Sequence, residues 1–336
     1  MSLEPAAQDS AVPKESAALM TLRPLSERAL TAESTEVMAY HGRTFRLASL
    51  LLPVSMRNDA SITYAFCRLI DDMVDEAESL EEGKVEIQAL RKAYQQETYH
   101  SNLQEGFSAL THRLNIPRRA VLDLMAGVEG DAESALLQSD AELIQYSYKV
   151  AGTVGLMMAR VLGVKDDSLL PFAIDMGIGM QLTNICRDVL EDAKRGRVYL
   201  PADRLKAAGT SHEELLSGQA NPEAVASVVR DVLTMAEDYY KSGLRGLCGV
   251  PWRARTGIIA AMVMYREIGR KLLRRGGNPL KGRTIVGPVR KGILICQAVL
   301  LSPCLPFWRR RQHHARLHSS LNGVEGANPP NVVKID

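Results

Sequence analysis

The chain carries two short segments in which aspartates recur four residues apart. The first pair is Asp71 and Asp75, and the second pair is Asp188 and Asp192. At about 100° per residue in an α-helix, residues four apart share a face, so each pair would direct two carboxylates the same way. Carboxylate oxygens without histidine or cysteine partners suit Mg²⁺, which typically bridges them to a substrate phosphate. The two segments therefore predict a magnesium centre that binds a diphosphate.

Each aspartate pair ends a polar row on a helix that is otherwise apolar. The row contains Tyr64 and Arg68 in the first helix, and Gln181 and Asn184 in the second. The flanking residues are mostly aliphatic, so both rows would run through the core of a folded domain. Buried carboxylates repel one another and are costly to desolvate unless a cation joins them. A solvated acidic face is the alternative for one row, but two rows of matching layout favour a metal centre.

Basic residues next to the aspartates indicate what this centre could do. Arg68 and Arg187 adjoin the two pairs, and a basic loop, residues 194–197, follows the second pair and could close over phosphate. Mg²⁺ and arginines neutralise the charge on a departing diphosphate, so an allylic carbocation can form. Aliphatic helix walls would keep water away from that carbocation. The expected chemistry is ionisation of an allylic diphosphate.

The elements that must position these residues are helices. Between about residues 33 and 275, apolar residues recur three and four apart, and short segments containing Pro or Gly interrupt them. This pattern predicts an all-α fold of several long helices joined by short loops. The 336 residues are 46% hydrophobic and 24% charged, which excludes a wholly disordered protein. The net charge of +2 does not indicate a nucleic-acid partner.

Composition divides the chain into four regions. Residues 1–30 are expected to be a flexible leader, residues 31–290 one helical domain, residues 291–318 an apolar and then basic segment, and residues 319–336 a disordered tail. The leader contains no continuous apolar stretch, so no signal peptide is predicted and a cytoplasmic location is expected. The sequence contains no run of 18 apolar residues, so no transmembrane helix is predicted.

The apolar and basic C-terminal segment allows two interpretations. Residues 293–308 contain two prolines and are too short to span a bilayer. They could form a final helix packed on the domain, followed by a solvated basic tail. Alternatively, they could attach the protein peripherally to an anionic membrane, at the inner membrane face.

Two stretches of sequence resemble a known family. Residues 64–76, YAFCRLIDDMVDE, and residues 181–201, QLTNICRDVLEDAKRGRVYLP, resemble the signature regions of the squalene/phytoene synthases, which are trans-isoprenyl diphosphate synthases. The resemblance extends from about residue 40 to residue 283. It implies a single-domain isoprenoid synthase fold for residues 31–290, with helices around a deep central cavity. It also implies a prenyltransferase that uses Mg²⁺, or Mn²⁺ in its place.

The same resemblance implies roles for individual residues. Tyr146, in the segment YSYKVAGTVG, would accept a proton or stabilise a cation, although a tyrosine packed for structural reasons is the alternative. HGRTF, residues 41–45, resembles a diphosphate-binding box in which Gly42 and Thr44 replace the usual serines. Asp131 aligns with an acidic family residue near the cavity. The implied metal ligands are Asp71, Asp72, Asp75, Asp188 and Asp192, and the implied substrate-binding residues are Arg43, Thr44, Phe45, Tyr64, Arg68, Gln181, Asn184, Arg187, Tyr265 and Arg283.

The resemblance implies that two geranylgeranyl diphosphates are joined head to head to phytoene through prephytoene diphosphate, without NADPH. The alternative within the family uses farnesyl diphosphate and forms presqualene diphosphate, dehydrosqualene or, with NADPH, squalene. A family member that acts only as an assembly factor is a rival of another class, but such a protein would be expected to lose aspartates that this chain retains.

Overall fold

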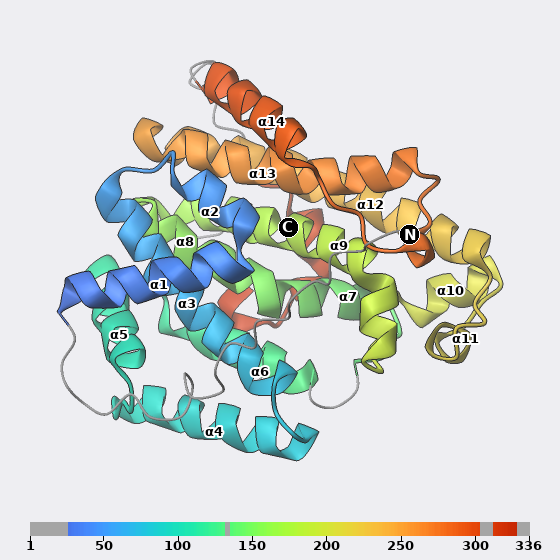
Figure 1. The fold of residues 1–336 in the computed structure, drawn as a ribbon, viewed down its shortest axis with the longest axis horizontal. Coiled ribbons are helices and arrows are strands. Elements are labelled where there is room, and N and C mark those ends of the chain that lie inside the picture. Colours follow the sequence, from blue (N-terminus) through green and yellow to red (C-terminus); the bar gives the residue numbers. More distant parts are fainter. Residues whose placement is uncertain (1–25, 132–134, 303–311, 328–336) are drawn as a thin grey trace, which may run out of the picture.

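In the computed structural model, residues 26–131, 135–302 and 312–327 are described, and most of them lie in helices (Figure 1). Within these ranges the only β-type pairing is an isolated parallel bridge between Leu136 and Val198. The predicted all-α fold is confirmed. The α-helices are α1 (Glu27–His41), α2 (Arg43–Ser49), α3 (Val54–Asp75), α4 (Leu80–Gln96), α5 (Asn102–Leu114), α6 (Arg118–Asp131), α7 (Asp140–Ser147), α8 (Thr153–Val161), α9 (Leu170–Lys194), α10 (Ala202–Ala208), α11 (His212–Leu216), α12 (Pro222–Gly246), α13 (Trp252–Arg274) and α14 (Pro288–Leu301). Shorter helical turns are η2 (Tyr148–Gly152), η3 (Asp167–Leu169), η4 (Leu247–Gly249), η5 (Pro279–Lys281), η7 (Ala315–Leu321) and η8 (Glu325–Ala327).

The helix α9 runs through the middle of the molecule, with α8, α12 and α13 packed against it (Figure 1). A row at intervals of four, Ile174, Ile178, Leu182 and Cys186, is almost completely buried. Residues four apart on a helix lie on one face, so this row forms a continuous apolar surface. The same helix carries Asp188 and Asp192 near its end, and the packing of the apolar row therefore fixes where these carboxylates lie.

The helix α3 has a similar division of faces. Ile62, Phe66, Ile70 and Val74 are buried at intervals of four, and the Phe66 ring stacks on Phe107 with centroids 3.8 Å apart. The polar row that includes Asp71 lies on another face of the helix. Burial of the apolar row thus orients the first aspartate pair.

Small residues allow α9 to approach its neighbours closely. A Cβ atom added at Gly177 would lie 2.2 Å from the carbonyl oxygen of Ala151, and one added at Gly155 would lie 2.2 Å from that of Ala173. These contacts join α9 to η2 and α8. The η2 segment is a π-helical turn between α7 and α8, a feature that occurs frequently at functional sites.

Helix α9 also has the composition of a membrane span. Residues Asp167–Lys194 are long and apolar enough to cross a bilayer, but 78% of the apolar window is buried inside the domain. A core helix of a folded domain satisfies the same criterion, and the close packing of α9 explains its apolar character.

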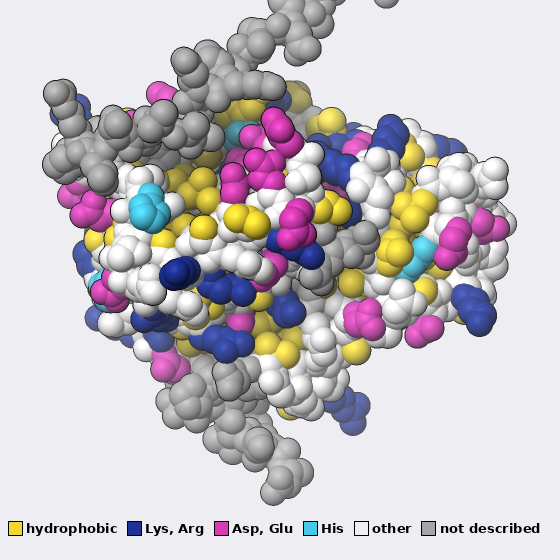
Figure 2. Space-filling model, turned by 90° about the horizontal axis from the view of Figure 1, so that it is seen from below, with side chains coloured by type: hydrophobic (Ala, Val, Ile, Leu, Met, Phe, Trp, Pro, Cys, Tyr) yellow, Lys and Arg dark blue, Asp and Glu magenta, His cyan; other side chains and the backbone are white. Residues whose placement is uncertain are grey.

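The molecular face seen from below carries acidic, basic and apolar side chains together, with one gathering of acidic groups (Figure 2).

The ends of the described chain differ from the sequence-based expectations. Helix α1 begins at Glu27, so the helical domain starts before residue 31, and residues 1–25 lie outside the described residues. The expected disordered tail is wrong for residues 319–327, because Leu321 and Ala327 are completely buried. Residues 312–327 return to the domain instead of forming a solvated tail, whereas 303–311 and 328–336 are not among the described residues.

The close approach at Gly177 gives a stability prediction. We expect Gly177→Ala to lower the free energy of unfolding by about 1–3 kcal/mol, because the added methyl group would collide with backbone atoms. Gly292→Ala is the matched control, since its Cβ would meet no atom within 4 Å and alanine favours the helix. Urea unfolding followed by circular dichroism measures both; equal stability of the two variants would contradict the packing account.

Candidate active site

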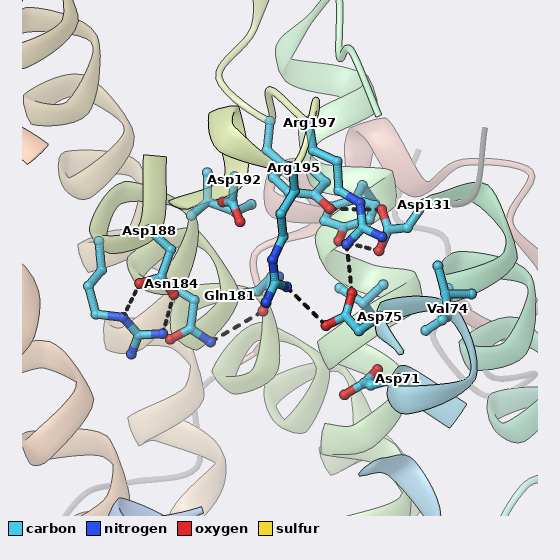
Figure 3. A pocket seen from close by; sticks show the side chains of 16 residues that line it. Asp71, Val74, Asp75, Asp131, Gln181, Asn184, Asp188, Asp192, Arg195 and Arg197 are labelled. Atoms are coloured by element: carbon cyan, nitrogen blue, oxygen red, sulfur yellow. Dashed lines mark hydrogen bonds and ion pairs between the residues drawn. The ribbon is translucent and has the colours of Figure 1, made fainter. Parts of the chain in front are cut away.

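The C-terminal halves of α3 and α9 line one cavity of about 270 Å³. Asp71 and Asp75 enter it from α3, and Asp188 and Asp192 enter it from α9 (Figure 3). The structure thus brings together the two aspartate pairs found in the sequence. The other lining residues are Val74, Val128, Asp131, Tyr146, Val150, Gln181, Asn184, Ile185, Arg187, Arg195, Arg197 and Tyr199.

Arginines hold one aspartate of each pair. The Asp75 carboxylate accepts hydrogen bonds from Arg197 at 2.8 Å and from Arg195 at 3.2 Å (Figure 3). Both arginines belong to the basic loop after α9, so this loop reaches across the cavity to α3. The sequence suggested a phosphate-binding loop here, but it did not indicate that the loop contacts Asp75.

The second held aspartate is Asp188. Arg187 Nε donates to its Oδ1 at 2.7 Å, and Arg283 Nε lies 2.9 Å from the same oxygen. Arg283 belongs to the connector after α13, which therefore returns to the cavity. Among the described residues, Asp71 and Asp192 have no hydrogen-bond or ion-pair partner, and Figure 3 shows both without one.

The two free aspartates are perturbed electrostatically. The pKa of Asp71 is raised to about 7, because burial outweighs the opposing charge of Arg68 and the neighbouring Asp75 adds to the rise. Burial and repulsion from Asp188 raise the pKa of Asp192 to about 7. Burial and neighbouring carboxylates thus disfavour the ionised form of these two aspartates, which no arginine holds among the described residues. Carboxylates of this kind fit a hard divalent cation, which would favour their ionised form.

A buried aspartate between two tyrosines lies at another part of the cavity wall. Tyr146 donates to Asp131 Oδ2 at 2.9 Å, and Tyr199 donates to Oδ1 at 3.0 Å. The two rings stack with centroids 4.6 Å apart. Burial raises the pKa of Asp131 to about 6, and burial followed by the charge of Asp131 raises the pKa of Tyr146 well above its ordinary value. The sequence analysis did not predict Tyr199 as a site residue, although Tyr199 lies inside the second signature segment.

Several predicted residues lie outside the cavity lining. Asp72 forms an ion pair with Arg68, four residues before it on α3. Phe45 packs against Tyr265 and Tyr64, with ring centroids 5.1 Å and 5.9 Å away. Two neighbours of Phe45 in α2 also lie outside the lining: Arg43 is exposed, and Thr44 accepts a hydrogen bond from Lys291 of α14 at 3.2 Å. Arg283 is not part of the lining either, but it reaches the cavity edge through Asp188.

Comparison with known proteins identifies the family. The squalene/phytoene synthase family model matches residues 38–290. The chain belongs to this family. It is 36% identical over 258 residues to the 15-cis-phytoene synthase of a Paracoccus species, a match that covers 74% of this chain and 83% of that protein. It is also 36% identical to a phytoene synthase of Thermus thermophilus, covering 79% of this chain and 90% of that one.

Solved structures give the same fold. A dehydrosqualene synthase in complex with a ligand superposes with a TM-score of 0.74 at 23% identity, covering 83% of this chain and 98% of that one. The squalene synthase HpnC from Alicyclobacillus acidocaldarius superposes with a TM-score of 0.66 at 21% identity, covering 75% and 96% of the two chains. The predicted isoprenoid synthase fold is therefore confirmed.

The raised pKa of Asp71 predicts a stability effect in metal-free protein. An unfolded aspartate releases its proton near pH 4, whereas folded Asp71 keeps it to about pH 7. The unfolded state therefore releases a proton first, and stability falls as pH rises between these values. We expect Asp71→Asn to raise the melting temperature at pH 8 by a few degrees in the presence of EDTA, and to have less effect at pH 5.

The matched control is Asp238→Asn, because Asp238 is exposed and pairs only with a nearby lysine among the described residues. Differential scanning calorimetry at the two pH values measures the effect. A lower melting temperature for Asp71→Asn at pH 8 would show that the ionised carboxylate is stabilising.

Proposed function

We propose that the protein joins two geranylgeranyl diphosphates head to head and forms phytoene through prephytoene diphosphate. The main support is the meeting of four aspartates in one cavity, in a chain that resembles curated phytoene synthases over most of their length. In this reaction two diphosphates leave and two protons are lost, one on forming prephytoene diphosphate and one in the final step, so no reductant is consumed. NADPH is therefore not expected as a cofactor.

The aspartates are proposed to bind Mg²⁺, or Mn²⁺ in its place. The metal ligands would be Asp71, Asp75, Asp188 and Asp192; Asp72, which pairs with Arg68, would support its neighbours from outside the cavity. The bound cation would supply positive charge to the departing diphosphate. No cysteine or histidine lines the cavity among the described residues, in agreement with a hard cation.

The arginines around the cavity are proposed to bind diphosphate. Arg187, Arg195, Arg197 and Arg283 each form an ion pair with an aspartate of the two pairs. Once these carboxylates bind a cation, the guanidinium groups become available to phosphate oxygens, which they can contact in bidentate fashion. Gln181 and Asn184, which share a 3.3 Å hydrogen bond, would help to orient the diphosphate.

The residues outside the cavity lining are proposed to contact the second substrate. Phe45, Tyr64 and Tyr265 form an aromatic group, in which the Phe45 ring centroid lies 5.9 Å from that of Tyr64 and 5.1 Å from that of Tyr265. Tyr64 belongs to α3, the helix that carries Asp71 and Asp75. Arg43 and Thr44 begin the helix that carries Phe45. They would bind the diphosphate, and Arg68 would assist from α3.

The apolar part of the wall is proposed to shelter the carbocation. Val74, Val128, Val150 and Ile185 line the cavity together with the polar groups. They exclude water, which would otherwise capture the cation. The final step needs a proton acceptor, and we assign this role to Tyr146 together with Asp131, which holds the tyrosine hydroxyl.

Product analysis tests the proposal. Purified protein with Mg²⁺ and geranylgeranyl diphosphate is expected to yield phytoene, identified by mass spectrometry and ultraviolet absorbance, with or without NADPH. Formation of a C30 product from farnesyl diphosphate alone would favour the alternative substrate. Absence of product from every mixture would favour an assembly factor, although such a protein has no need of the four aspartates.

Substitution of the proposed ligands gives a sharper test. We expect Asp75→Asn and Asp188→Asn each to lower turnover by about 10²–10³-fold or more, because charge stabilisation of the leaving diphosphate is lost. The control is Asp238→Asn, whose carboxylate is exposed and distant in sequence from both signatures. Circular dichroism would establish that the helices remain; full activity of either ligand variant would exclude its carboxylate from metal binding.

Membrane contact is proposed for the outer face of α14. Val289 and Leu300 are 79% and 74% exposed, whereas Leu294 and Ala298 on the same helix are buried. The helix therefore packs on the domain and still presents apolar side chains outward. A peripheral contact with a bilayer would suit the release of a C40 hydrocarbon.

Liposome flotation tests this contact. We expect the double variant Val289→Ser and Leu300→Ser to float several-fold less than the unchanged protein on anionic vesicles. Val85→Ser is the control, because Val85 is exposed on α4, on the opposite side of the molecule from α14 (Figure 1). Equal flotation of all three proteins would exclude α14 as the attachment surface.

A further inference from the structure

A second group of potential ligands lies away from the proposed active site. Asp175 is in the first half of α9, and its side chain is completely buried. Asp188 follows thirteen residues later on the same helix, which corresponds to about 20 Å along its axis. His313 and His318 reach Asp175 from the C-terminal segment that returns to the domain. None of the three residues lines the active-site cavity.

The three side chains converge closely. His313 Nε2 lies 2.7 Å from Asp175 Oδ2, and His318 Nε2 lies 2.9 Å from Oδ1. One potential ligand atom from each residue lies within 4.8 Å of the others. The histidine side chains are only 8% and 7% exposed, and Phe172 packs edge-on against His313 with centroids 5.2 Å apart.

The charge of this group requires compensation. A fully buried carboxylate is costly to desolvate unless it is paired or bound to a cation. Among the described residues no lysine or arginine pairs with Asp175, and its only ion-pair partners are the two histidines. Neutral imidazoles would leave one net negative charge in the protein interior. A divalent cation between the three side chains would neutralise it.

We propose that Asp175, His313 and His318 bind a divalent transition metal, with Zn²⁺ the best match. Two imidazole nitrogens and one carboxylate oxygen suit Zn²⁺, whereas the all-carboxylate active site suits Mg²⁺. Three protein ligands leave a fourth position for water in tetrahedral coordination. The site is thus chemically distinct from the site proposed for catalysis.

The metal would fasten the C-terminal segment to α9. Hydrogen bonds also attach this segment, such as those from Tyr239 to the Leu317 carbonyl at 2.7 Å and from Gln145 to the Ser320 carbonyl at 2.9 Å, and its Leu321 and Ala327 are buried in the core. Metal binding that requires the docked segment stabilises that state by mass action. The basic sequence RRRQHHARLH therefore contains two inward-directed ligands, His313 and His318, and an exposed histidine, His314.

Metal titration of untagged, full-length protein tests the proposal. After treatment with chelator, the protein is titrated with Zn²⁺ in the presence of millimolar Mg²⁺, which competes at the carboxylate centre. We expect one Zn²⁺ per chain, a rise in the melting temperature, and a visible absorption spectrum of tetrahedral type when Co²⁺ replaces Zn²⁺. Because the cobalt spectrum is measured on the unchanged protein, this part of the test stands even if a variant fails to fold.

Variants locate the binding. The double variant His313→Gln and His318→Gln is expected to weaken Zn²⁺ binding by at least about 100-fold and to remove the cobalt spectrum. His314→Gln is the matched control and should retain both. Absence of stoichiometric Zn²⁺ binding by the unchanged protein would show that the group is only a hydrogen-bonded cluster. Equal loss in the His314 variant would also overturn the assignment.

Discussion

The mutual repulsion of carboxylates around one cavity governs how this molecule is arranged. Asp71 and Asp192 come from two helices far apart in the chain, and burial raises the pKa of each to about 7. A folded protein does not gather such groups without a compensating charge. The surrounding structure serves this requirement, because apolar rows on α3 and α9 fix the helices and small residues such as Gly177 bring η2 close to α9.

The arginines compensate only part of the negative charge of the four aspartates. One aspartate of each pair is held by guanidinium groups from loops and connectors, and the other has no partner among the described residues. The site is therefore half neutralised without a cation. In the proposed reaction, cations would take the place of the arginines on these carboxylates, and the arginines would then contact the diphosphates.

Helix α9 places buried carboxylates in two different environments. Burial alone would raise the pKa of Asp175, but hydrogen bonds from His313 and His318 outweigh it and hold the pKa below its ordinary value. Near the other end of the helix, burial and then repulsion from Asp188 raise the pKa of Asp192 to about 7. One helix thus supports an ionised aspartate among imidazoles and a partly protonated aspartate among carboxylates. Their neighbours, rather than burial itself, determine the difference.

The sequence alone determined the helical fold and the family, and it predicted that the two aspartate pairs form one metal centre. These follow from apolar spacing and from two local signatures, which are set by residues close together in the chain. Only the tertiary structure decided which arginines contact Asp75 and Asp188, that Tyr199 joins Tyr146 at Asp131, and that Asp72 lies outside the cavity lining. It also turned His313 and His318 toward Asp175, where sequence reasoning expected a solvated tail. Contacts between distant segments depend on how whole helices pack, and no local spacing encodes them.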